Sequence, residues 1–207
     1  MRDDFGITGP APYRIVILTL DSHAAGPIDR ARDRLARDFP GLVITVHAAA
    51  EWGETPAALS MARADIASAD MILANLLFLE EHVRPILPDL AAARDRVDGM
   101  IGIIADAEIV KLTKLGNLDM SAPQSGMMQL MKRLRGSSKP STESGEKKMQ
   151  MLRRLPRILR FIPGKAQDLR SWFLVMQYWL GGSDDNIEAM IRYLLGRYAS
   201  RTEWRGG

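Results

Sequence analysis

Three side chains that often act together in catalysis are adjacent near the start of the chain, as Asp21, Ser22 and His23. A Ser-His-Asp triad is normally assembled from separate positions, and adjacent residues rarely reach the required geometry. The sequence also lacks a G-x-S-x-G turn, which would present a serine nucleophile. We therefore assign no catalytic residue, and we interpret Asp21, Ser22 and His23 as a polar loop whose side chains are candidates for contact with a bound cofactor.

Groups that could bind a metal ion or a phosphate are sparse. The histidines, His23, His47 and His82, show no H-x-x-H or H-E-x-x-H spacing, so no metal site is predicted. His47 with Glu51 is the best of this weak set. The glycine-rich patterns that hold dinucleotides or triphosphates are absent. Asn75 interrupts an apolar stretch, and because a buried amide needs hydrogen-bond partners, we favour a structural contact for it over a ligand contact.

The segment that positions these residues is Arg14 to His23, an aliphatic run that ends in the polar cluster. Such a run is typical of a strand buried on both faces. In an open parallel sheet, loops at the carboxyl ends of the strands line the functional crevice. Similar units follow along the chain. Further strands are predicted at Leu42–Ala48, Met71–Leu77 and Asp98–Ala105, and helices at Ile28–Phe39, Pro56–Ala69, Glu80–Arg96 and Ala107–Leu115, the last capped by Gly116-Asn117.

This alternation predicts an α/β fold with a four-stranded parallel sheet, flavodoxin-like or Rossmann-like, and helices on both faces. We expect the first strand to be central. The predicted organisation is a sheet domain at 1–120, a Met-rich turn and flexible basic linker at 121–148, a helical segment at 149–200 and an atypical tail at 201–207.

The helical segment is predicted to contain three helices, at Met149–Ile162, Asp168–Leu180 and Asn186–Tyr198. The middle helix is apolar almost all round, as a helix buried on every side would be. We expect it to pack against structure outside this chain.

The composition of the 207 residues suits a globular protein, with 46% hydrophobic and 26% charged residues. The chain has no cysteine, which fits a reducing cytoplasm. Its apolar runs are shorter than the roughly 20 residues of a membrane span. Gly126 to Arg170 carries twelve Lys or Arg against three Asp or Glu, whereas the whole chain has a net charge of only +3. The basic run Lys147 to Arg160 could bind nucleic acid or an anionic membrane surface, but a solvated helix face is at least as good an explanation, and no specific nucleic-acid partner is predicted.

Longer strings of residues carry a family resemblance. They include Y-R-I-V-I-L-T-L-D-S-H from Tyr13, F-I-P-G-K-A-Q-D-L-R-S-W-F from Phe161 and W-L-G-G-S-D-D-N from Trp179. From Met1 to about Tyr198 the chain resembles the N-terminus of the large, porphyrin-binding subunit of magnesium chelatase, in the version of the bacteriochlorophyll pathway. The last residues, R-T-E-W-R-G-G, do not look like the family's continuation, so we expect the chain to be part of a longer subunit.

The resemblance implies a role in inserting Mg²⁺ into protoporphyrin IX for chlorophyll biosynthesis, in a complex that uses ATP. It implies as partners the remainder of the large subunit and two AAA+ subunits that hydrolyse ATP. It also suggests a weak porphyrin contact through Trp172 and Trp179. No cofactor is assigned to this chain, and no family residue that acts on metal or porphyrin can be carried onto a number here. We expect a non-catalytic structural or subunit-interaction domain. The alternative is a stand-alone regulatory module that binds the ATPase subunits or an anionic partner.

Overall fold

The computed structural model describes residues 11–20, 22–121 and 165–206. The predicted linker at 121–148 therefore lies outside the described residues except for Ser121, as does the helix predicted at Met149–Ile162. The strands are β1 Tyr13–Thr19, β2 Leu42–Ala48, β3 Met71–Asn75, β4 Gly99–Ile103, β5 Lys114–Leu115 and β6 Leu118–Asp119. The α-helices are α1 Ala25–Asp38, α2 Pro56–Ser68, α3 Glu80–Val83, α4 Leu87–Ala93, α5 Ala107–Lys111, α8 Lys165–Gly181 and α9 Asp184–Tyr198.

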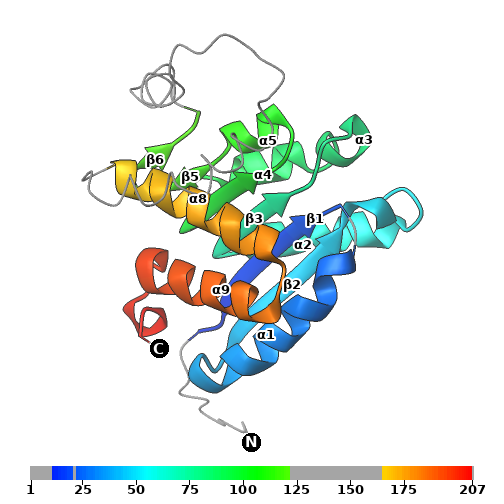
Figure 1. Ribbon diagram of the computed structural model, residues 1–207. Helices are drawn as coiled ribbons and strands as arrows, with labels where there is room; N and C mark the ends of the chain where they lie inside the picture. Colours follow the sequence, from blue (N-terminus) through cyan, green and yellow to red (C-terminus); the bar gives the residue numbers. More distant parts are fainter. Residues whose placement is uncertain (1–10, 21, 122–164, 207) are drawn as a thin grey trace, which may run out of the picture.

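The strands form one mixed sheet in the order β2-β1-β3-β4-β5-β6 (Figure 1). The first four strands are parallel, with β1 between β2 and β3, as expected. The prediction of a four-stranded, wholly parallel sheet is wrong, because β5 and β6 add an antiparallel hairpin beside β4. The helix predicted to continue to Leu115 ends at Lys111, and Gly116-Asn117 forms the hairpin turn instead of a helix cap.

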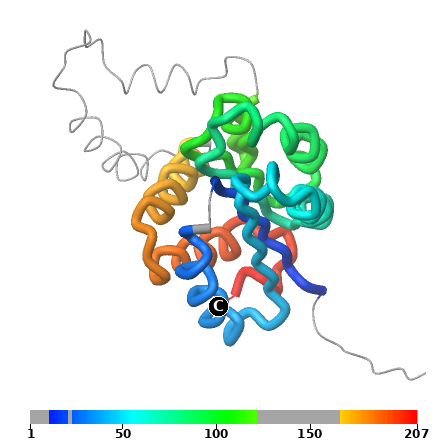
Figure 2. The backbone as a smooth tube through the Cα atoms, turned by 90° about the vertical axis from the view of Figure 1, so that its right-hand side faces the viewer, coloured from blue at the N-terminus to red at the C-terminus, as the bar shows by residue number. Residues whose placement is uncertain are grey.

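The sheet is covered on both faces by helices, and each face has its own large hydrophobic cluster, with a smaller third cluster between β6 and α8. One cluster joins the sheet to α1, α8 and α9, and the other joins it to α2, α4 and α5. Figure 2 shows the two sets of helices on opposite sides of the molecule. Strand β1 lies between the layers, with Ile15 and Ile17 in the first cluster and Val16 and Leu18 in the second. All four are at most 2% exposed, which confirms the prediction of a strand buried on both faces.

Helix α1 and the proline-containing region after β3 follow their sequence patterns. The apolar residues of α1 recur at helical spacing, and Ile28, Ala31 and Leu35 are buried, as is Phe39 directly after the helix. The helix predicted at Glu80–Arg96 is interrupted between α3 and α4, where Pro85 lies. Pro85 accounts for this break, because proline lacks the N–H that a helix interior requires.

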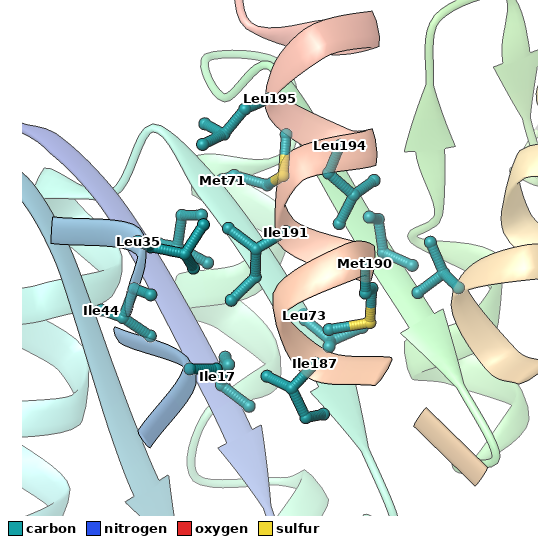
Figure 3. Packing of buried hydrophobic residues seen from close by; sticks show 14 of the residues in the cluster. Ile17, Leu35, Ile44, Met71, Leu73, Ile187, Met190, Ile191, Leu194 and Leu195 are labelled. Atoms are coloured by element: carbon teal, nitrogen blue, oxygen red, sulfur yellow. The ribbon is translucent and has the colours of Figure 1, made fainter. Parts of the chain in front are cut away.

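The most apolar helix, α8, packs on the sheet of its own chain. Phe173, Val175 and Trp179 are buried, the last at 8% exposure. The indole of Trp172 donates to the carbonyl of Gly102 in β4 at 2.9 Å. The expectation that structure outside the chain is needed to cover this helix is therefore wrong for these residues, because they are buried within the chain itself, on the face of the sheet that α1 and α9 also cover. Figure 3 shows α9 side chains, including Ile187 and Ile191, directed at the strands and α1.

Candidate functional site

The carboxyl ends of the parallel strands meet at one edge of the sheet, where β1 lies between β2 and β3. The chain leaves β1 for β2 on one side and reaches β3 on the other, so the change of direction falls between β1 and β3. In open α/β sheets, ligands bind outside the strand ends at such a point. The short helix η1, Ser22–Ala24, follows β1 here, and Asn75 is the last residue of β3. The sequence therefore predicted the correct edge for these residues.

Two buried side chains at this point, those of Thr19 and Asn75, bind each other. The amide of Asn75 donates to the carbonyl of Leu18 at 2.9 Å, and its oxygen accepts from the hydroxyl of Thr19 at 3.1 Å. Asn75 is 0% exposed and Thr19 is 1% exposed. The amide thus ties the end of β3 to the end of β1, which is the structural contact favoured from the sequence.

The remaining candidates of the polar loop are described only in part. Asp21 and the side chain of Ser22 lie outside the described residues, whereas His23 belongs to η1 and is exposed. Of the three loop candidates, His23 is therefore the one whose side chain the structure places at the same edge as Asn75.

Two residues beside Asn75 have an unusual backbone. Leu76 and Ile104, which follow β3 and β4, have φ values of 55° and 46°. Residues other than glycine rarely adopt this left-handed backbone conformation, and a β-branched isoleucine is a clear outlier there. The N–H of Leu76 donates to the carbonyl of Ile104 at 2.9 Å, so the two strained residues support one another. Sequence reasoning missed both, since neither position carries glycine or asparagine.

The weak metal candidates do not come together. His47 of β2 has its Nε2 2.8 Å from a carboxylate oxygen of Asp65 in α2, whereas Glu51 was the partner suggested by the sequence. Among the described residues, no group of three or more His, Asp or Glu side chains is placed to hold a metal ion. The contact of His47 with Asp65 therefore joins β2 to α2 as a pair.

A buried polar cluster that the sequence analysis missed centres on Asp168, in the first turn of α8. Asp168 is 5% exposed, and its carboxylate accepts from the backbone N–H of Asn117 and the hydroxyl of Tyr198, both at 2.8 Å. Arg197 approaches it at 3.4 Å. Burial, reinforced by the bond to Asp168, raises the pKa of Tyr198 well above its usual value, against opposing contacts from Ser171 and Arg197. The cluster fastens the β5–β6 turn to α8 and α9.

A second cluster at the amino edge of the sheet includes the residues predicted to form an atypical tail. Trp204 is 2% exposed and packs against Tyr13, with ring centroids 5.5 Å apart. The hydroxyl of Tyr13 donates to Asp98 at 2.8 Å, and Arg201 lies 3.1 Å from Asp70. The residues of this cluster are scattered singly along the chain and form no periodic pattern. The sequence therefore gave no sign that they contact one another in the folded protein.

No helix in the described ranges is long and apolar enough to cross a membrane.

Comparison with known proteins places this fold in a family. Residues 14–173 match the family described as "Domain of unknown function (DUF3479)". The chain belongs to this family. The DUF3479 match includes the whole sheet apart from Tyr13, and the first half of α8.

Curated proteins similar to this DUF3479 chain include the H-subunits of two bacterial magnesium chelatases. The protein of Rhodobacter capsulatus is 58% identical over 197 residues, which cover 95% of this chain and 17% of the relative. The protein of Cereibacter sphaeroides is 59% identical over 201 residues, covering 96% of this chain and 17% of the relative. The chloroplastic magnesium-chelatase protein ChlH of Oryza sativa subsp. indica is 33% identical over 139 residues, covering 65% of this chain and 10% of the relative. The chain thus spans about a sixth of the length of the two bacterial relatives.

Proposed function

We propose that this chain acts in magnesium chelatase as part of the porphyrin-binding subunit, within the complex that inserts Mg²⁺ into protoporphyrin IX in bacteriochlorophyll biosynthesis. The observation that carries the proposal is the 58% identity with a magnesium-chelatase H-subunit over 95% of this chain. Identity of that degree extends from the sheet into the C-terminal helices, so it supports a shared role for the whole fold rather than for one motif.

Within that complex we propose a structural and subunit-interaction role without a catalytic step of its own. Mg²⁺ prefers six oxygen ligands and loses its hydration water reluctantly, so its insertion requires a dedicated site. A base must also remove the two pyrrole protons of the porphyrin beside the bound macrocycle. Two polar residues of the carboxyl edge, Thr19 and Asn75, are buried and bonded to each other, whereas His23 is exposed. That pairing favours a supporting role for the edge.

The two tryptophans that the sequence suggested for porphyrin contact also favour this assignment. Trp179 is buried in the core, and Trp172 is half-buried with its indole N–H bonded to β4. We therefore propose no porphyrin contact through Trp172 and Trp179. The proposed partners are the rest of the large subunit and the two ATP-hydrolysing subunits, and Mg²⁺, ATP and protoporphyrin IX are requirements of the full complex.

A complementation assay tests the proposal. The magnesium-chelatase H-subunit of Cereibacter sphaeroides would be prepared without the region matched by this chain, and combined with both ATPase subunits, ATP, Mg²⁺ and protoporphyrin IX. We expect the shortened subunit to be impaired, and this chain added in trans to restore formation of Mg-protoporphyrin, followed by fluorescence. The chain with the ATPase subunits but without the shortened subunit should form none. Full activity of the shortened subunit, or turnover by this chain alone, would refute the proposal.

A further inference from the structure

The two borders of the sheet are built differently. One border is β6, which has only two residues and whose Asp119 is tied to Arg94 of the chain segment after α4. The other border is β2, which has seven residues, L-V-I-T-V-H-A, and pairs only with β1 in the described structure (Figure 1). A bordering strand presents every second N–H and C=O group outward, ready to pair with another strand.

Strand β2 is also the least covered of the parallel strands. Five of its seven residues are partly exposed, whereas all five residues of β3 and of β4 are buried. Natural sheets usually protect a bordering strand with lysine, proline, a bulge or a very short length. Strand β2 has none of these protections, and its one titratable side chain, His47, is bound to Asp65 on α2.

The sequence of β2 is complementary to itself. If two copies run antiparallel about Thr45, that residue faces its own counterpart, Ile44 faces Val46 and Val43 faces His47. Pairs of β-branched residues across an antiparallel ladder are stabilising, and no two like charges meet in this register. A two-fold axis perpendicular to the sheet would produce this register and would leave the helical layers of both copies on matching faces.

The flank of α1 that overhangs β2 allows this approach. Arg34 of α1 bonds to Asp184 of α9, which places the opposite flank of the helix on the side of β2. By helical spacing that flank carries Ala36, Asp29 and Arg32, and the last two form an ion pair at 3.0 Å. The small alanine permits close contact between helices, and the paired charges leave no net repulsion.

We propose that β2 is a self-association edge, through which a second copy of this chain extends the sheet across a two-fold axis. The occupant is a second copy because the strand matches itself in register and because neither the exposed backbone nor the adjacent flank of α1 carries an excess charge that would select a different partner.

Single cysteines test the register, since the natural chain has none. Thr45→Cys removes no hydrogen bond, because the hydroxyl of Thr45 has no partner among the described residues. In the proposed dimer, two Cys side chains at position 45 lie directly opposite one another, within the reach of a disulfide. Residue 43 lies about 14 Å from its own counterpart, four residues out of register at roughly 3.4 Å each, so Val43→Cys is a matched control. Phe78→Cys, on the 53% exposed Phe78 that follows β3 and lies away from β2, measures random collision.

Under mild oxidation we expect Thr45→Cys to form at least roughly tenfold more covalent dimer than either control, because only this pair meets disulfide geometry. Sedimentation equilibrium of the unmodified chain should show a dimer whose fraction rises with concentration. Thr45→Lys should lower that fraction roughly tenfold or more, because two lysines would face one another, while Phe78→Lys leaves it unchanged. Circular dichroism would verify that the variants are folded. Equal cross-linking at all three cysteine positions, or a strictly monomeric unmodified chain, would refute the proposal.

Discussion

The turn between β5 and β6 should tolerate no side chain at Gly116, for two reasons that can be separated. Gly116 has a φ of 56°, in the left-handed region. A Cβ added there would lie 2.7 Å from a carboxylate oxygen of Asp168, closer than real Cβ contacts allow. Because Asp168 is buried and bonded to Asn117 and Tyr198, it cannot move away without breaking those bonds.

The expected cost of Gly116→Ala follows from these contacts. The left-handed conformation costs alanine about 1–2 kcal/mol relative to the favoured backbone. Displacing the carboxylate breaks at least one hydrogen bond to a charged group, which costs about 1.5–3 kcal/mol. We therefore expect the free energy of unfolding to fall by about 2.5–5 kcal/mol, measured by urea denaturation with the linear extrapolation.

Gly182 provides the control for backbone strain alone. Its φ is 64°, but the nearest atom to an added Cβ is the carbonyl oxygen of Trp179 at 3.9 Å, an ordinary contact. Gly182→Ala should lower the free energy of unfolding by only about 1–2 kcal/mol, the cost of a left-handed backbone for alanine. In a chain that already carries Asp168→Ala, the loss of unfolding free energy caused by Gly116→Ala should also fall to that level. The double-mutant cycle should then give a coupling free energy of about 2 kcal/mol. Equal losses for Gly116→Ala and Gly182→Ala would show that the buried carboxylate does not restrict the turn.

Three further outcomes are expected. Ile17→Asp should lower the unfolding free energy by several kcal/mol, because it places an unpaired carboxylate in the core; a urea midpoint equal to that of Met61→Asp would contradict the central position of β1. Burial, and then the bond to Asp98, raises the pKa of Tyr13 far above its usual value. In the unfolded chain the hydroxyl of Tyr13 ionises near pH 10, whereas in the folded chain it stays protonated at that pH. The free energy of unfolding should therefore decline as the pH rises above about 10, and Tyr13→Phe should flatten that decline. Finally, nucleic-acid binding through the basic run Lys147 to Arg160, which lies outside the described residues, should weaken steeply with salt and show no sequence preference; a salt-resistant, sequence-dependent gel shift would contradict this.

The parallel part of the fold could be predicted because its signals are local. A strand buried on both faces reads as an unbroken aliphatic run, and the stripe of α1 repeats at helical spacing, so β1 and α1 were recognised from their own residues. The hairpin of β5 and β6 was missed although Gly-Asn between two short apolar runs is a hairpin signal. Its strands have only two residues each, too few for alternation to be seen, and the preceding helix was predicted to continue into them.

The candidate site was predicted in position but not in its contacts. The loop after β1 and the end of β3 were assigned to one edge because parallel strands end together. The pairing of Asn75 with Thr19 depends on the register between β1 and β3, which the sequence does not contain. The strained backbone of Leu76 and Ile104 was invisible for a related reason, since the cost of the strain is offset by packing and by a hydrogen bond between two loops.

The C-terminal helices show why a family match and a folding unit need not coincide. The DUF3479 match ends at Phe173, within α8, yet α9 contributes Ile187, Met190 and Ile191 to the same hydrophobic cluster as β1. Farther along, Trp204 is buried against Tyr13, the first residue of β1. A chain cut at the end of the match would leave one face of the sheet without α9 and would expose several fully buried apolar side chains, each contributing about 1.5–3 kcal/mol when buried. The physical domain in this chain therefore extends beyond the family match, to the residues that pack against the first strand.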